Sequence, residues 1–177
     1  MANIKIALEM VLDYEGGHVK DPDDTGGETY RGISRRYHPE WEGWAYIDVG
    51  DWNGADRLVE EFYRENYWNK LCGDSIRSQE IANELMEMCI HLGHYRVHVV
   101  LQEGVNLFNN RQKLWKDIKV DGVIGKKTIS ALDKADKRGR SSSIVKYLNC
   151  EQGHMYKLSI KKREINEKYA VGWYKRT

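Results

Sequence analysis

Three polar side chains near the start of the chain have types and spacings that suit the hydrolysis of a sugar linkage. Glu15 is followed directly by Gly16 and Gly17, and Asp24 and Thr29 come shortly afterwards. Cleavage of a glycosidic bond needs one group that protonates the leaving oxygen and a second that activates water or stabilises the cationic sugar. Glu15 suits the first task. A carboxylate and a hydroxyl on a returning loop could hold one water opposite it.

Glu15 is expected at the end of a helix, which suits a proton donor. Apolar residues recur at helical spacing before it, and they predict an amphipathic helix over residues 3–15 that Gly16 and Gly17 end. The C-terminal end of a helix carries a partial negative charge, which disfavours a carboxylate. Burial beside Tyr14 would act in the same direction, so the pKa of Glu15 is expected to be raised.

The same acidic stretch admits a second interpretation, a calcium loop. Asp21, Asp23, Thr25 and Gly26 fall at the first, third, fifth and sixth positions of the EF-hand pattern. The twelfth position is Gly32, where that pattern requires a bidentate glutamate. Calcium is therefore disfavoured.

Three histidines offer another alternative, a zinc site. His91, His94 and His98 lie three and four residues apart and would share one helix face. The chain has no H-E-x-x-H motif and no acidic partner at the usual spacing, so no metal and no other cofactor is expected. A nucleophile elbow and a phosphate-binding glycine loop are absent from the sequence as well.

The remaining patterns predict a mainly α chain of about seven helices with a small β element near residues 28–50. The stretches "ETYRGIS" and "WAYIDVG" favour short strands. The helical pattern returns from Asp51, and Ser78 is placed to cap a later helix. Residues 138–143 are the best linker candidate, and a long last helix is expected over roughly 142–168.

The tryptophans divide into two groups. Trp68 and Trp115 follow apolar helical spacing and are expected in the core. Trp41, Trp44 and Trp52 flank the β element, where two interpretations stay open: stacking on sugar faces, or packing of the small sheet.

The composition is that of a globular chain. Of its residues, 31% are charged and 41% hydrophobic. The length of 177 residues suits one domain, or one compact domain with a small appended module. Residues 1–65 hold 15 acidic against 7 basic residues, and residues 66–177 hold 12 against 21. The basic part could attract an anionic partner, but no recognition motif accompanies it, so nucleic acid is not expected. Three widely spaced cysteines without a C-x-x-C pair indicate reduced thiols.

One spaced signature spans residues 15–33. It reads glutamate, two glycines, a short spacer, then aspartate-x-glycine-glycine-x-threonine-x-x-glycine-isoleucine. Its places are filled here by Glu15, Gly16, Gly17, Asp24, Gly26, Gly27, Thr29, Gly32 and Ile33. This signature resembles that of glycoside hydrolase family 108, the lysozyme-like N-acetylmuramidases of phages and bacteria. "YRENYWNK" resembles the family's Tyr-Trp helix, and "DGVIGKKTISAL" and "VGWYKR" resemble its C-terminal peptidoglycan-binding region.

The resemblance implies a lysozyme-like glycosidase that cleaves between N-acetylmuramic acid and N-acetylglucosamine. Glu15 would be the general acid, and Asp24 and Thr29 would hold the water. The separation of the two carboxyl groups decides between retention and inversion at the sugar carbon, and of the two we favour inversion. Six residues are assigned to substrate binding: Gly16, Gly17, Gly26, Gly27, Tyr30 and His91.

The resemblance also implies a division of the chain. A lysozyme-like (α+β) hydrolase domain is expected over residues 1–93, with a helical peptidoglycan-binding region over 94–177 packed on it. One departure falls in the helix after Ser78. Relatives tend to carry aspartate and asparagine there, where this chain has Glu87 and His91. That helix is expected to line the cleft.

Peptidoglycan glycan strands are the implied partner, in phage or prophage lysis as an endolysin, or in wall remodelling as a secretion activator. The alternative is a non-catalytic wall-binding or secretion-regulating protein on the same fold. Glu9 and Asp13 interrupt the first apolar residues, so no signal peptide and no membrane insertion are expected. We expect a monomer made in the cytoplasm, which reaches the wall or periplasm through a holin, through secretion machinery or by lysis.

Overall fold

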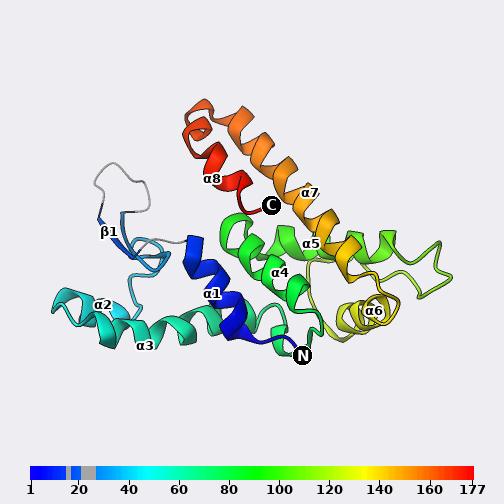
Figure 1. The fold of residues 1–177 in the computed structure, drawn as a ribbon, viewed down its shortest axis with the longest axis horizontal. Coiled ribbons are helices and arrows are strands. Elements are labelled where there is room, and N and C mark those ends of the chain that lie inside the picture. The colour runs from blue at the N-terminus through cyan, green and yellow to red at the C-terminus, as the bar shows by residue number, and fades with distance from the viewer. Residues whose placement is uncertain (15–16, 21–26) are drawn as a thin grey trace.

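The computed structural model describes residues 1–14, 17–20 and 27–177. Within these residues the chain forms eight α-helices and a three-stranded antiparallel sheet (Figure 1). The predicted mainly α fold with a small β element is therefore confirmed. The elements in chain order are α1 (Ile4–Tyr14), β1 (His18–Lys20), β2 (Glu28–Tyr30), β3 (Ile33–Ser34), α2 (Gly43–Asp48), α3 (Trp52–Tyr63), the π-helical turn η1 (Arg64–Trp68), the 3₁₀ turn η2 (Gly73–Ser75), α4 (Gln79–Leu92), α5 (His94–Leu107), α6 (Lys126–Asp136), α7 (Ser141–Lys162), the 3₁₀ segment η3 (Glu164–Tyr169) and α8 (Ala170–Tyr174).

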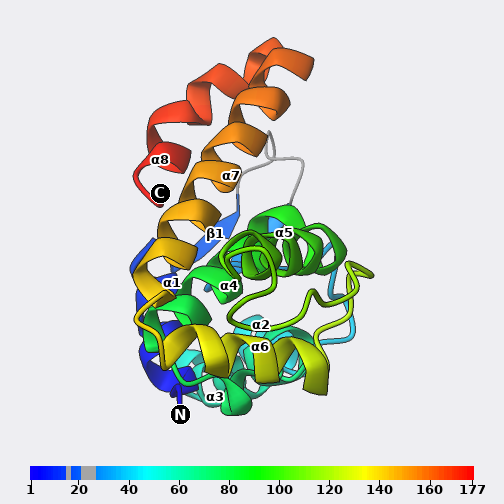
Figure 2. The same cartoon turned by 90° about the vertical axis from the view of Figure 1, so that its right-hand side faces the viewer.

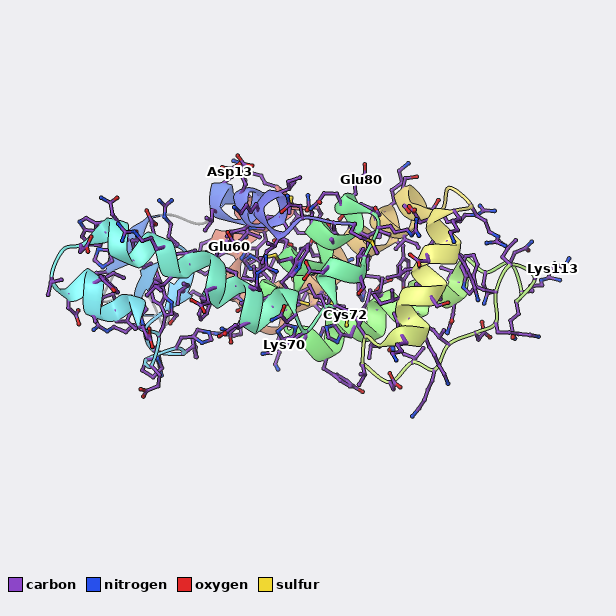
Figure 3. The ribbon with its side chains drawn as sticks, turned by 90° about the horizontal axis from the view of Figure 1, so that it is seen from below. Asp13, Glu60, Lys70, Cys72, Glu80 and Lys113 are labelled. Carbon is purple, nitrogen blue, oxygen red and sulfur yellow. The ribbon has the colours of Figure 1, made fainter. Side chains whose placement is uncertain are left out.

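Helix α1 packs one apolar face against α4, as Figure 1 shows. The buried residues of α1 recur three or four positions apart: Ile4, Ala7, Leu8 and Val11. Asp13 lies on the exposed face at the end of the same helix (Figure 3). The amphipathic helix predicted here is confirmed. It ends at Tyr14, the residue before Glu15, and it packs against α4.

Helix α4 lies at the centre of the packing, because it contacts α1, η1, α5 and α7. Its start is capped as predicted: the Ser78 hydroxyl accepts a hydrogen bond from the amide of Ile81 at 3.3 Å. Its buried apolar face consists of Ile81, Ala82, Leu85, Met86, Met88 and Cys89. Figures 1 and 2 show α7 running across α4 and α5, with α8 folded back beside it.

The small sheet is a meander of three short strands. Strand β1 pairs with β2 so that Val19 faces Thr29, and β2 pairs with β3 so that Tyr30 faces Ile33. Arg31 and Gly32 form the turn between β2 and β3, and both have positive φ angles of 49° and 78°. Two such residues in succession are typical of a two-residue hairpin turn. The strands predicted in "ETYRGIS" are confirmed.

The strand predicted in "WAYIDVG" is wrong, because these residues form α2. Trp44 and Ile47 both lie in the core, and their three-residue spacing places them on one face of a helix rather than on opposite faces of a strand. Gly50, with a φ of +76°, then reverses the chain toward α3. Burial of these two side chains outweighs the β preference of the local sequence.

The single helix predicted over residues 142–168 is also wrong. Helix α7 ends at Lys162, because Arg163 adopts an extended backbone with φ −141° and ψ 100°. The chain then returns along α7, where the Tyr174 hydroxyl donates to the carbonyl of Gly153 at 2.8 Å. The rings of Trp173 and Tyr156 lie 5.2 Å apart. Packing of these aromatic rings favours the reversal over a longer, solvated helix.

One continuous cluster of buried apolar side chains runs from α1 to α7. Trp68 and Trp115 belong to it with 0% and 4% of their surface exposed, which confirms their predicted place in the core. The indole of Trp68 donates to Asp74 at 2.8 Å, so its polar atom is satisfied inside the protein. No helix among the described residues has the length and apolar character needed to cross a bilayer.

The cap of α4 leads to the first prediction. Replacing Ser78 with alanine leaves the Ile81 amide without its acceptor, so the free energy of unfolding should fall by about 1 kcal/mol. Urea denaturation followed by circular dichroism measures the change. Ser142→Ala is the matched control, since Ser142 is exposed in the first turn of α7. Equal midpoints for the two variants would contradict a stabilising cap.

Candidate active site

Four of the predicted site residues lie outside the described residues: Glu15, Gly16, Asp24 and Gly26. The calcium interpretation falls on the same acidic stretch. The residues that flank these positions are held by the sheet. The Gly17 carbonyl accepts a hydrogen bond from the Arg31 amide at 3.1 Å, and Lys20 pairs with Glu28 across β1 and β2. The chain therefore enters the sheet two residues after Glu15.

Gly17 and Gly27 both leave open space beside the backbone. A Cβ built on either glycine would meet no described atom within 4 Å. Gly27 also has a φ of +68°, a conformation that residues with a side chain rarely adopt. A side chain at Gly17 would fill space, whereas one at Gly27 would strain the start of β2.

Thr29 and Tyr30 are neighbours on β2, so their side chains point to opposite faces of the sheet. Tyr30 is only 4% exposed, and its hydroxyl donates to Asp56 at 2.9 Å. Thr29 is half-buried at the centre of the sheet, between Val19 and Ser34. The face of Tyr30 is thus the core face, and Thr29 lies on the other one.

Charged side chains surround Glu28, the first residue of β2. Glu28 accepts from Arg35 at 2.8 Å and lies 2.9 Å from a ring nitrogen of His18. Arg35 also donates to both carboxylate oxygens of Asp48, at 2.7 and 2.5 Å. The hydrogen bond from Arg35 is the main reason that the pKa of Glu28 is lowered. Glu28 is therefore an anion with its oxygens occupied, and it is not a proton donor.

Aromatic rings line the core face of the sheet and continue into a groove. The ring of Tyr30 stacks between Trp41 at 6.2 Å and Trp52 at 5.9 Å. Trp44 is buried and donates to the His38 carbonyl at 2.8 Å, so it packs the fold. Trp52 remains 43% exposed. Trp41 lines a groove of about 570 Å³ between residues 37–42 and the end of α3.

Two carboxyl groups of α4 lie inside the protein. Glu84 and Glu87 are 9% and 2% exposed. Burial first, and then the charge of Glu87, raises the pKa of Glu84 to about 8. The side-chain amide of Asn149 on α7 donates to the Glu84 carboxyl at 2.7 Å in the orientation that suits both groups. The raised pKa favours the protonated form of Glu84 at neutral pH.

The C-terminal residues close over this helix. Arg176 donates to Glu87 at 3.4 Å and to the Nε2 atom of His91. Gln152 on α7 donates to the other oxygen of Glu87. Burial first, and then the charge of Arg176, lowers the pKa of His91 to about 4, so its ring is neutral. His91 is thus held by groups of its own chain, and it joins α4 to the C-terminus.

The sequence patterns single out Glu87 and His91 and include Arg176 in "VGWYKR", but they miss Glu84 and Gln152 and the contact of Arg176 with α4. A signal for Glu84 exists: it falls within the apolar face that Ile81, Leu85 and Met88 define. Local spacing does not pair Glu87 with its partners, because Gln152 and Arg176 are 65 and 89 residues away from it in the sequence.

Comparison with known proteins finds two family models that match parts of the chain. The family model "Glycosyl hydrolase 108" matches residues 8–93, and the model "Predicted Peptidoglycan domain" matches residues 97–177. No curated protein matches the chain. Among solved structures, Brucella abortus SagA is similar, with 27% identity and a TM-score of 0.69 over 98% of this chain and 88% of that one.

The buried acid Glu84 leads to a prediction on pH dependence. Its pKa is raised from an unfolded value of 4.5 to about 8, so the folded state holds the extra proton and stability falls as pH rises through this window. His91, lowered from 6.5 to about 4, acts in the opposite direction but only below pH 6.5. Between about pH 6.5 and 8 the free energy of unfolding should therefore fall through Glu84 without the opposing effect of His91. The slope should be no more than about 1.4 kcal/mol per pH unit. Glu84→Gln should flatten the profile there.

Urea unfolding at a series of pH values measures this profile. Glu80→Gln is the control, because Glu80 lies on the same helix but on the surface (Figure 3). A wild-type profile that is already flat between pH 6.5 and 8 would mean that Glu84 is ionised in the folded state.

Proposed function

The chain belongs to glycosyl hydrolase family 108 and ends in a peptidoglycan domain, and from this we propose that it hydrolyses peptidoglycan as a muramidase. The bond cleaved is the one between N-acetylmuramic acid and N-acetylglucosamine. The observation that carries the proposal is that the catalytic signature lies inside the matched hydrolase domain, directly after α1.

Glu15 acts as the general acid in this proposal. Helix α1 ends at Tyr14, so Glu15 follows the carbonyl end of a helix packed against α4. The partial negative charge of that end disfavours the ionised carboxyl and favours a retained proton. No described atom lies within 4 Å of a Cβ built at Gly17, so the described residues leave room for a sugar two positions after Glu15 in the chain.

Asp24 and Thr29 hold the attacking water in this proposal, so the anomeric configuration inverts. Support comes from β2, where Thr29 lies on the sheet face opposite the buried Tyr30. The cross-strand bond between Arg31 and Gly17 ties this strand to the residues that follow Glu15. Glu28 cannot take the place of Asp24, because His18 and Arg35 occupy its oxygens.

The other assigned residues support the glycan strand. Gly16, Gly17, Gly26 and Gly27 carry no side chain that would keep a sugar away from the backbone. Tyr30 has an indirect role: its ring stacks on that of Trp52 and orients it. The exposed ring of Trp52 offers a stacking surface for a sugar. His91 acts through Arg176, which fixes the C-terminus against α4.

We place the hydrolase domain at residues 1–93 and the wall-binding region at 94–177. The protein acts on the cell wall, either in lysis as an endolysin of a phage or prophage, or in local remodelling for secretion. It acts there as a monomer, after export or lysis.

Digestion of purified sacculi tests the proposal. Wild type should release muropeptides with new reducing ends at N-acetylmuramic acid, identified by mass spectrometry. Glu15→Gln should lower the rate by about 10²–10⁴-fold, the range for loss of a general acid. Asp24→Asn should lower it as well, and Glu80→Gln, on the surface of α4, should not.

Sacculus pull-down separates catalysis from binding. Glu15→Gln should still sediment with sacculi, because the substitution removes only a proton donor. If wild type sediments with sacculi but releases no reducing ends, the protein is a wall-binding member of the family and the hydrolytic proposal fails.

A further inference from the structure

A cluster of three metal-binding side chains lies where α4 meets α5, and the proposed glycan chemistry uses none of them. Cys89 stands on the last turn of α4, and His94 and His98 stand on the first two turns of α5. One ligand atom of each lies within 4.8 Å of the other two. Gly93, with a φ of +82°, is the only residue between the helices and brings their ends together.

His98 is oriented as a metal ligand. Its Nδ1 lies 2.9 Å from the Gly122 carbonyl, which can only accept, so Nδ1 carries the proton. The lone pair is then on Nε2, a buried atom with no hydrogen-bond partner among the described residues. His98 is 6% exposed, so this nitrogen has lost its water without gaining a partner. Metal-bound histidines typically donate their other ring N–H to a carbonyl in this way.

His94 repeats the arrangement with the opposite nitrogen. Its Nδ1 is buried, and no described residue bonds to it. Protonation of Nε2 leaves the lone pair of His94 on this buried Nδ1. The ring packs against Tyr67 with centroids 5.3 Å apart, which fixes its plane. Burying two ring nitrogens without hydrogen-bond partners costs free energy unless a ligand binds both of them.

Cys89 supplies the third atom. Its side chain is a free, buried thiol. A metal binds neutral imidazoles and a thiolate, so binding here would release the proton of the Cys89 thiol. Two charged groups interact electrostatically with the cluster: Lys70 with His94, and Glu87 with Cys89. They have opposite signs, and Lys70 projects outward from the surface (Figure 3).

We propose that Cys89 Sγ, His94 Nδ1 and His98 Nε2 bind one Zn²⁺ ion, with water in the fourth position. A thiolate with two imidazoles in tetrahedral array is a typical zinc set, and harder cations such as Mg²⁺ prefer oxygen. Bond lengths of about 2.0–2.3 Å require ligand atoms about 3.5 Å apart. The side chains must therefore approach by about 1 Å from the present maximum, within reach of small side-chain rotations. The ion fixes the angle between α4 and α5.

The sequence predicts no metal, because His91, His94 and His98 come without an H-E-x-x-H motif and without an acidic partner at the usual spacing. The structure separates His91, which bonds to Arg176, and brings Cys89 into its place. Cys89 lies five residues before His94, beyond the helix break at Gly93, so helical spacing gives no hint of it.

Cobalt titration tests the proposal on the full chain after metal removal with a chelator. Co²⁺ bound through Cys89 produces a thiolate-to-metal charge-transfer absorption, which should saturate at one equivalent. Zn²⁺ should displace the cobalt and raise the thermal midpoint of the protein. Cys89→Ser should abolish the charge-transfer band, and His98→Gln should weaken zinc binding by at least about tenfold.

Two matched variants serve as controls. Cys150→Ser and His154→Gln alter an exposed thiol and an exposed imidazole on α7, and both should bind metal as wild type does. His94→Gln provides a test at a half-buried residue if Cys89→Ser does not fold. Absence of the band in wild type overturns the proposal. So does a band that survives Cys89→Ser, or zinc affinity unchanged in a folded His94→Gln variant.

Discussion

Helix α4 carries two carboxyl groups inside the protein, and their need for partners determines how the C-terminal third of the chain packs. A buried carboxyl left without a partner is strongly destabilising. Glu84 meets Asn149, and Glu87 meets Gln152 and Arg176, so both helix α7 and the last residues must lie against α4. The opposite side of α4 supports α1. Helix α1 ends at Tyr14, one residue before Glu15. The position of that helix end therefore depends on α4, and the polar contacts of Glu84 and Glu87 hold α4 in place.

The small sheet is attached by a different balance of forces. The ion pairs of Arg35 with Glu28 and Asp48 are partly exposed, and such pairs contribute about 0–1 kcal/mol each. Burial of one large side chain contributes about 1.5–3 kcal/mol, and Tyr30 and Ile33 are both buried. The apolar contacts therefore anchor the sheet, and the ion pairs mainly orient Glu28. This division keeps one face of β2 in the core and leaves the face of Thr29 for other contacts.

The sequence predicts what local patterns determine. Helix α1 and the Ser78 cap follow from spacing and residue type, and both are confirmed. The β preference around Trp44 misleads, because burial of Trp44 with Ile47 requires a helix. The reversal after Arg163 depends on rings far apart in the sequence, which no local pattern contains. The same holds for the site: the motif locates the candidate acids, whereas the partners of Glu84 and Glu87 come from tertiary contacts alone.

Glu84 has a property expected of a general acid, a pKa near 8, so the preference for Glu15 needs a reason. A proton donor must reach the glycosidic oxygen as well as hold a proton. Glu84 is 9% exposed, and Asn149 of α7 occupies its carboxyl. Substrate could reach it only if α7 moved away, and that movement would remove the partners of Glu87 as well. Burial is thus the main reason both for the raised pKa of Glu84 and for its lack of access, and for this reason the proposal assigns proton donation to Glu15.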